Sequence, residues 1–487
     1  MMTSEARHLP AEAGPGIARH WRQSKAWTLI TAALPWAAAV GLALAIWFGS
    51  PLDPPAKVAL IVFALAIVGW CLTGLDDTLI ALTAAALLVL TGARSARDLH
   101  SALGNDMTWL LIGAFIIAAA LRSSGLTERL ARAALSKATS VTAVFFYATG
   151  MILATALVVP STSGRATLLL PVYLALASVL RDVRTRRALA LLFPTVILLS
   201  AGGSLIGAGA HLIAVEMIQN SGGPAYGFLG WLVLGMPLAL MASFAATAVI
   251  LLAFLSQAER RLSIALPHAS DSGMTAQQRY VAVIVLAVVA GWCSQSFHGV
   301  DAAMVTLCGA IALTIKPFAP INLKEATKSV EWQLILFLAA TTLMGQALIA
   351  TGAAKALLQP VLALLPAESL ARPALVATMV TVLALLSHLL ITSRSARASV
   401  LIPLLATPLA ESGYDFGAVT MLVVMATGFC QTLPASAKPV ALYADLEHET
   451  YRKRDLALLS AFLLPLFAGL LLMFSLWIWP AIGLSLR

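Results

Sequence analysis

The sequence predicts an all-α protein that crosses a lipid bilayer many times and contains two helical hairpins that enter and leave on one side. Of its 487 residues, 60% are hydrophobic and only 11% are charged, whereas roughly a quarter of the residues of a soluble protein are charged. Apolar runs long enough to span a bilayer alternate with short polar gaps. In addition, one short polar stretch occurs twice, at 158–172 and 390–404.

The apolar runs predict about eleven spans and two re-entrant hairpins. We place the spans at 27–48, 57–74, 78–92, 107–121, 188–217, 228–255, 279–296, 299–315, 331–351, 415–444 and 456–480. The hairpins are expected at 141–180 and 373–410, and the spans 188–217 and 415–444 are expected to be broken. The chain then divides into a tail at 1–26, a first span with its loop at 27–56, a repeat at 57–258, a linker at 259–278 and a second repeat at 279–487.

Arginines and lysines orient these spans. Basic groups precede the first span, precede the first hairpin and follow that hairpin. Placing these groups in the cytoplasm also places most of the other basic residues there, provided that each hairpin enters and leaves on the same side. The positive-inside rule therefore predicts a protein of the inner (cell) membrane with a cytoplasmic amino terminus and a carboxyl terminus outside.

The repeated stretch reads VVPSTSGRATLLLPV in the first copy and LITSRSARASVLIPL in the second. Each copy sets hydroxyl groups, small residues and an arginine, Arg165 or Arg397, between two apolar arms. A charge at the bilayer centre costs a few kcal/mol, so an arginine there usually faces protein or water and marks a pathway or a binding site. Because an odd number of spans separates the copies, the second repeat is expected to be inverted. The two hairpin tips would then meet near the midplane, as in alternating-access transporters.

Two further segments interrupt their apolar runs with glycine, proline and hydroxyl residues. The first reads SAGGSLIGAGAH at 200–211, and the second reads TGFCQTLPASAKP at 427–439. Glycine and proline leave backbone N–H and C=O groups free, and helix amino termini add partial positive charge. We therefore expect a small anion as the guest.

These segments resemble the divalent-anion/sodium symporter family, the carriers of di- and tricarboxylates and sulfate. That family has Ser-Asn-Thr at both hairpin tips and a glycine-rich break. Here residues 161–163 and 393–395 stand at the tips and residues 203–207 at the break. The resemblance covers nearly the whole chain from about residue 27. It implies a homodimer in which a transport domain moves like an elevator along a fixed scaffold and holds one small anion between the tips.

At both tips the sequence departs from the family pattern. Thr162 and Arg394 replace asparagines that take part in sodium sites in the family, and a guanidinium group cannot ligate a cation. We hypothesise that fixed cations replace the second sodium site, or both sites, which favours anion exchange or proton coupling over sodium symport. A residual sodium site near Ser161, Thr162 and Gly203 remains open, and no other cofactor is expected.

Candidate site residues come from both tips and both breaks. The substrate-binding candidates are Ser161, Thr162, Ser163, Arg165, Ser393, Arg394, Ser395, Arg397, Gly203, Ser204, Gly207, Thr432, Ser436 and Lys438. His211 is the candidate for proton coupling. As alternatives, the arginines hold each tip shut by ion pairs or by clamping carbonyl groups, and the tip serines cap helices. Glu216 and Asp445 lie near span ends and are expected to be solvated.

The leading function is a secondary carrier of small multivalent anions, with di- or tricarboxylates first and sulfate or a sulfonate next. The alternative is a sodium-coupled symporter of the same anions. A cation/proton antiporter fits less well because it needs carboxylates at the midplane, and a channel because paired hairpins favour gating around one site. The sequence has no HExxH or GxSxG motif, so no enzymatic activity is expected.

Two compositional features exclude other classes of protein. The net charge of +9 comes from basic residues in short loops, which positive-inside topology explains without a nucleic-acid partner. The four cysteines are far apart and form neither a disulfide framework nor a CxxC metal motif. The expected partners are therefore the lipid bilayer, a small anion and a second copy of the chain.

Overall fold

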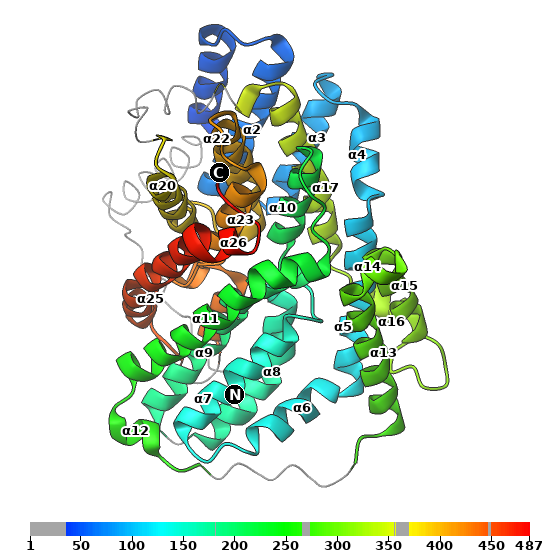
Figure 1. The fold of residues 1–487 in the computed structure, drawn as a ribbon, viewed down its shortest axis with the longest axis vertical. Coiled ribbons are helices and arrows are strands. Elements are labelled where there is room, and N and C mark those ends of the chain that lie inside the picture. Colours follow the sequence, from blue (N-terminus) through cyan, green and yellow to red (C-terminus); the bar gives the residue numbers. More distant parts are fainter. Residues whose placement is uncertain (1–35, 181, 265–272, 355, 357–369, 447–449) are drawn as a thin grey trace, which may run out of the picture.

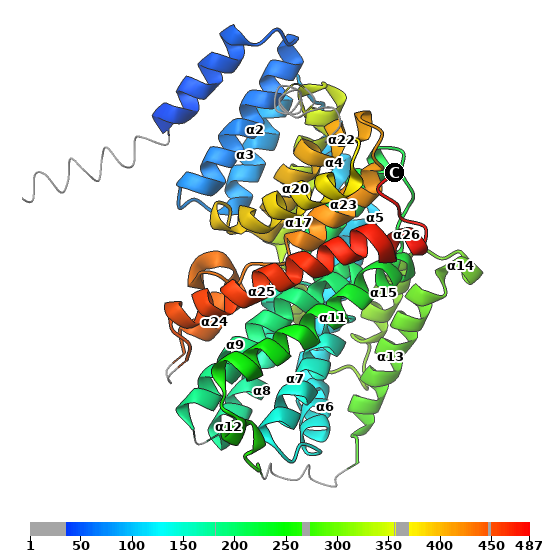
Figure 2. The ribbon, with the colours of Figure 1, turned by 60° about the vertical axis from the view of Figure 1, so that its left-hand side comes forward.

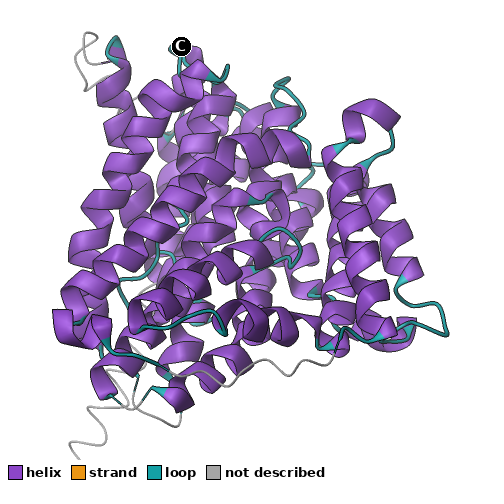
Figure 3. Ribbon diagram, turned by 60° about the horizontal axis from the view of Figure 1, so that its bottom comes forward, coloured by secondary structure: helices purple, strands orange, loops and turns teal. Residues whose placement is uncertain are grey.

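The computed structural model describes residues 36–180, 182–264, 273–354, 356, 370–446 and 450–487. Within these ranges the regular structure is helical and there is no strand, only an isolated bridge between Ser140 and Ser263 (Figure 3). The predicted all-α fold class is confirmed. Eight of the described helices are long and apolar enough to cross a membrane, and the total of eleven spans stays a prediction.

In the first half of the chain, simple helices come first, and a hairpin, a broken helix and a further long helix follow them. This half contains the helix Trp36–Gly49, α2 (Pro54–Leu72), α3 (Asp77–Leu90), α4 (Ala96–Leu103), α5 (Asp106–Ser124), α6 (Leu126–Leu135), α7 (Val141–Thr155), α8 (Thr162–Val179), α9 (Val183–Ser200), the 3-10 turns η1 (Ala201–Gly203) and η2 (Leu205–Gly207), α10 (Gly209–Asn220), α11 (Phe228–Phe254) and α12 (Gln257–Arg261).

The described part of the second half follows a similar order. It contains α13 (Ala276–Cys293), α14 (Gln295–His298), α15 (Ala302–Ala312), α16 (Leu323–Lys328), α17 (Trp332–Ala350), α20 (Pro373–Leu386), η3 (Ser387–Leu389), α21 (Arg394–Leu401), the π-helix η4 (Ile402–Ala406), α22 (Thr407–Glu411), α23 (Phe416–Ala426), η5 (Pro434–Ser436), α24 (Lys438–Ala444), α25 (Lys453–Met473), the π-helix η6 (Phe474–Ile478) and α26 (Trp479–Ala481).

Local sequence signals account for where these helices begin and end. The Asp76 carboxylate caps α3 by accepting the backbone N–H groups of Thr78 and Leu79, and the Asn105 side chain caps α5 in the same way. Gly125 ends α5 in the left-handed conformation, with φ 66°, where an L side chain would be strained. Polar residues between apolar runs thus set the helix boundaries.

Helices from the two halves of the chain are interlocked. Figure 1 shows α5 beside α15 and α17 beside α3, and these are among the most extensive helix contacts (Figure 1). The same exchange occurs around the breaks, because α10 packs on α21 while α24 packs on α8 and α9. Each half therefore completes the packing of the other.

Among the eight long apolar helices that the structure describes, the broken helix α9 is the most buried. In its apolar segment, Val183–Gly203, 89% of residues are buried, compared with 22% in α13. The helix α11 packs on it, and α25 crosses the molecule side by side with α11 (Figure 2). Such a difference is expected when α9 is wrapped by protein on every side and α13 leaves most of its surface for lipid.

Candidate functional site

A cavity of about 830 Å³ joins the two hairpin tips. It lies among the tip of hairpin α7–α8, the tip of hairpin α20–α21, the second parts of both broken helices, and the ends of α2, α3 and α17. We call it the central cavity. Of the predicted site residues, its lining contains Ser161, Thr162, Ser163, Ser393, Arg394, Ser395 and Lys438.

Several helices begin at the central cavity. The lining contains the amino-terminal residues of α8, α10 and α21, and of the shorter helix α24. At Gly209 in α10, an added Cβ atom would lie 3.0 Å from the Ser395 hydroxyl, so the second tip and the first break are in close contact. Helix amino termini carry partial positive charge and free N–H groups. Their convergence makes the central cavity favourable for an anion.

The first tip is held in an unusual backbone conformation at Ser161. This residue has φ 71° and is the one non-glycine residue with positive φ among those described. Its N–H group donates to the Ile206 carbonyl oxygen at 3.3 Å, which ties the tip to the break between α9 and α10. Its hydroxyl group caps α8 by accepting the Gly164 N–H group. A strained residue of this kind persists when its surroundings fix it, and such residues cluster at functional sites.

Arg394, at the second tip, reaches from one half of the chain to the other. Its Nη2 atom lies 2.9 Å from His211 Nε2 and 3.5 Å from the Val424 carbonyl oxygen. Its Nε and Nη1 atoms are buried and have no hydrogen-bond partner among the described residues. An unsatisfied buried guanidinium is costly. This arginine therefore has spare capacity to bind an anion.

His211 is fixed on both sides of its ring. Its Nδ1 atom lies 2.8 Å from the Ser204 carbonyl oxygen, so Nδ1 carries the proton and donates it. Nε2 then accepts a hydrogen bond from Arg394, which requires the neutral imidazole. The ring also packs against Trp231, with centroids 4.9 Å apart. In this arrangement the neutral His211 supports Arg394, and its one ring proton is held by the Ser204 carbonyl group.

Arg165 lies outside the lining of the central cavity and is fully buried. Its Nη1 atom donates to the Ile197 carbonyl oxygen at 3.0 Å, and Nη2 donates to the Ile152 carbonyl oxygen at 2.8 Å. Nη2 also donates to Ser200 Oγ at 2.6 Å, and Nε donates to Thr155 Oγ1 at 3.2 Å. All three nitrogen atoms are thus used within the protein. This arrangement favours the carbonyl clamp over contact with substrate.

Arg397 forms the corresponding contacts in the second hairpin. It is also fully buried and outside the cavity lining, and it donates to the carbonyl oxygens of Thr427 at 2.9 Å and Phe429 at 3.3 Å. These carbonyl groups lie at the end of α23, just as Ile197 lies near the end of α9. Each arginine therefore fastens a hairpin to the carboxyl end of the broken helix that follows it.

The remaining predicted residues lie behind the cavity surface, outside its lining. Gly203 faces Met236 and Ala239 of α11, and Gly207 lies so close to the Ala201 carbonyl oxygen that a Cβ atom would be 2.2 Å from it.

The hydroxyl residues among them serve local structure. Ser204 is buried and offers its carbonyl group to His211. Ser436 accepts the Leu433 N–H group at 3.0 Å. Thr432 lies between His388 and Ser460, at 2.7 and 2.6 Å. These residues shape the two breaks.

Carboxylates in the central cavity were missed by the sequence analysis. Asp76, Asp77 and Glu331 line it together with Arg394 and Lys438. Asp77 and Glu331 stand at the starts of α3 and α17, and Glu331 Oε1 would lie 3.5 Å from a Cβ atom added at Gly164 of the first tip. The sequence feature that could have identified them is the Asp76-Asp77 pair between two apolar runs, since acidic residues in such places usually have a function.

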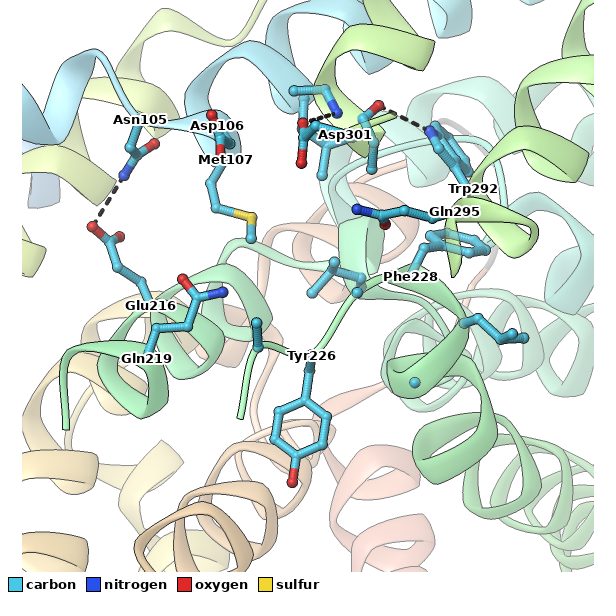
Figure 4. A pocket seen from close by; sticks show the side chains of 18 of the residues that line it. Asn105, Asp106, Met107, Glu216, Gln219, Tyr226, Phe228, Trp292, Gln295 and Asp301 are labelled. Carbon is cyan, nitrogen blue, oxygen red and sulfur yellow. Dashed lines mark hydrogen bonds between the residues drawn. The ribbon is translucent and has the colours of Figure 1, made fainter. Parts of the chain in front are cut away.

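A second cavity, of about 690 Å³, lies between the start of α5, the end of α10 and the start of α11 (Figure 4). In it, Glu216 of α10 accepts hydrogen bonds from Asn105 Nδ2 at 3.0 Å and from Thr342 Oγ1 at 2.7 Å. The expectation of a solvated Glu216 is therefore wrong, because interlocking brings α5 and α17 over it.

The two cavities have matching walls. In the central cavity Trp70 Nε1 donates to the Asp77 carbonyl oxygen at 3.2 Å. In the second cavity Trp292 Nε1 donates to the Ala302 carbonyl oxygen at 3.3 Å. Asp77 and Ala302 are the first residues of α3 and α15. The same tryptophan-to-helix contact thus borders both cavities.

The chain is similar to known proteins over most of its length. Residues 25–485 match the family model described as the sodium:sulfate symporter transmembrane region. A protein of Cupriavidus necator described as a membrane protein is 24% identical over 397 residues, which cover 78% of this chain and 75% of that protein. The crystal structure of the Alcanivorax borkumensis YdaH transporter, described as having an unusual topology, has a TM-score of 0.53 and 15% identity, and the match covers 89% of this chain and 100% of that one.

Proposed function

The chain belongs to the sodium:sulfate symporter family, and we propose that it carries small multivalent anions, with di- and tricarboxylates as the preferred class and sulfate or a sulfonate next. Family membership makes it a multi-pass membrane transporter and not an enzyme. The finer assignment rests on the central cavity.

One observation carries this proposal: the starts of α8, α10 and α21 converge with Arg394 and Lys438 on a single cavity. A helix amino terminus or a cation at the surface of a cavity stabilises negative charge inside the cavity. Arg394 also has two buried nitrogen atoms without a partner in the described part of the chain. The volume of about 830 Å³ is sufficient for a small multivalent organic anion.

Alternating access of the elevator type is the mechanism that we propose. Equivalent contacts in the two halves support an arrangement of two inverted repeats, because the pairs α5–α15 and α17–α3 correspond, as do the clamps of Arg165 and Arg397. The transport domain would comprise the two hairpins and the two broken helices. A homodimer in the inner membrane, with a cytoplasmic amino terminus, completes the proposal.

Anion exchange is the form of coupling that the site supports best. Arg394 brings a fixed positive charge to the tip where the family resemblance implies a sodium ligand, and a guanidinium repels a cation. His211 accepts a hydrogen bond from this arginine and so favours exchange over proton coupling. The Nε and Nη1 atoms of Arg394, which lack a partner among the described residues, gain one when an anion is bound, and this favours movement of the loaded carrier. The alternative, sodium symport, depends on the uncharged tip at Ser161 and Thr162.

Transport by the purified chain in liposomes tests this function. Labelled succinate should enter liposomes loaded with unlabelled succinate, without a sodium gradient, and should enter much more slowly when the lumen holds no exchangeable anion. Strict dependence on sodium with no exchange would support the symport alternative. Absence of anion flux and binding across dicarboxylates, citrate and sulfate would overturn the proposed function.

A further inference from the structure

The central cavity holds more carboxylates than a site for a simple dianion needs. Asp76, Asp77 and Glu331 line it against the two cations Arg394 and Lys438. Asp76 uses a carboxylate oxygen to cap α3, with N···O distances of 2.9 and 3.1 Å. The carboxylates of Asp77 and Glu331 face the cavity from the starts of α3 and α17. They would repel a plain dicarboxylate at close range.

These two carboxylates lie at the starts of neighbouring helices, close to the tips. Asp77 lines the cavity together with Ser393 of the second tip, and Glu331 lines it together with Ser161 of the first, where Glu331 Oε1 would lie 3.5 Å from a Cβ atom added at Gly164. Both come from helices outside the hairpins, α3 and α17, which pack on each other. Lys438 lines the same cavity. Its lining therefore contains both cations and carboxylates.

The carboxylates are poorly placed for an inorganic ion. Among the described residues, no three side chains of His, Cys, Asp or Glu are close enough to hold a metal ion. A hard cation such as magnesium or calcium needs several oxygen ligands around one point. Separate carboxylates at the starts of α3 and α17 suit a cationic group that forms part of a larger ligand and donates several hydrogen bonds.

We infer that the substrate is zwitterionic, an organic anion that also bears a protonated amine. In this arrangement, which rests on the proposed function, the acidic groups of the substrate face the helix amino termini, Arg394 and Lys438. The ammonium group of the substrate donates to Asp77 and Glu331. The substrate class is thus an amino dicarboxylate or an aminosulfonate, and the carboxylates select it against the same anion without nitrogen.

Binding to the purified full-length protein tests this inference with two matched pairs of probes. L-Aspartate is succinate with an added ammonium group, and taurine is ethanesulfonate with an added ammonium group. We expect the aminated member of each pair to bind at least about tenfold more tightly, the effect of a partly desolvated charge pair. Equal or weaker binding of the aminated members, while succinate binds, would overturn the inference and leave the proposed function standing. Failure of every anion to bind would overturn the proposed function itself.

Variants identify the groups that select the amine. In the double variant D77N/E331Q the preference for L-aspartate over succinate should disappear, so that the ratio of their dissociation constants falls to about one. The matched control is D445N, which removes an exposed carboxylate at the end of α24, outside the cavity lining. Retention of the amine preference in D77N/E331Q would contradict the assignment. So would succinate binding that requires sodium and is lost in this variant, because the carboxylates would then hold an inorganic cation.

Discussion

Arg394 donates a hydrogen bond of 2.9 Å to His211, and this contact joins the second hairpin tip to the first broken helix. The two residues are 183 positions apart in the sequence. Because the imidazole is neutral, the guanidinium charge has no counter-charge in this contact. The pair therefore places a fixed positive charge in the lining of the central cavity.

Removal of the Arg394 charge should weaken anion binding. We expect R394Q to lower the affinity for the best dianion about tenfold to a hundredfold, because a charge-assisted contact is lost. Titration calorimetry of the purified protein measures the change. R184Q serves as the control because the Arg184 side chain is exposed. An unchanged affinity in R394Q would show that this charge plays no part in binding.

His211 should contribute no pH dependence to anion binding. Sulfate keeps its charge between about pH 6 and 8, where an ordinary histidine titrates. If His211 gained a proton on acidification, its positive charge would tighten sulfate binding. We expect a flat profile in wild type and in H211Q. A profile that rises at low pH in wild type and becomes flat in H211Q would restore His211 as a coupling residue.

The Arg165 clamp should affect stability more than binding. R165Q leaves the carbonyl oxygens of Ile152 and Ile197 without their charged donor, at a cost of about 3 kcal/mol or more. We expect a clearly lower melting temperature and, in the folded fraction, nearly unchanged anion affinity. R394Q should show the opposite pattern, with a lower anion affinity and a nearly unchanged melting temperature. A loss of affinity in R165Q at wild-type stability would place Arg165 in the binding site.

Glu216 should act as a latch between α10 and the helices α5 and α17. Its carboxylate holds Asn105 and Thr342, which lie on elements that stay behind if α10 moves as an elevator. We expect E216A and T342V each to lower the melting temperature. In the double variant, the loss in the free energy of unfolding should be smaller than the sum of the two single losses by about 1 kcal/mol, because both single variants remove the same hydrogen bond. Full additivity would show that the two side chains do not interact.

The sequence predicted the tips and breaks because polar residues within apolar runs have few stable placements in a bilayer. It did not predict the direction in which each arginine points. Arg165 and Arg394 stand in similar contexts, yet one is saturated by carbonyl groups and the other faces the cavity. The number of free carbonyl groups at a helix break depends on the exact turn at which the helix ends, and an apolar pattern does not fix that turn.

The acidic residues of the site could not be predicted from the sequence, for another reason. Asp77 and Glu331 are 254 positions apart and meet the tips only because α3 and α17 interlock across the two halves. Periodicity within a helix identifies its buried face but not the partner helix. Pairing between repeats, and therefore the composition of the cavity wall, required the three-dimensional structure.

Gly235 of α11 allows the closest backbone approach to the first break. A Cβ atom at this position would lie 2.2 Å from the Gly202 carbonyl oxygen, which also accepts a hydrogen bond of 3.0 Å from Trp231 Nε1. The added Cβ atom would be fixed to the backbone of α11, and the oxygen atom belongs to the backbone of the break, so α11 would have to move away from the break. Such overpacking typically costs about 1–3 kcal/mol.

We therefore expect G235A to lower the melting temperature and to weaken anion binding, since the displaced break carries the start of α10. Gly230 provides a matched control on the same helix, because the nearest atom to its added Cβ is Tyr226 Cδ1 at 3.7 Å. G230A should be neutral or more stable by up to about 1 kcal/mol, the usual helix preference for alanine. Equal melting temperatures for the two variants would mean that α11 can yield at the break without cost, and the close approach would then have no role in positioning the cavity.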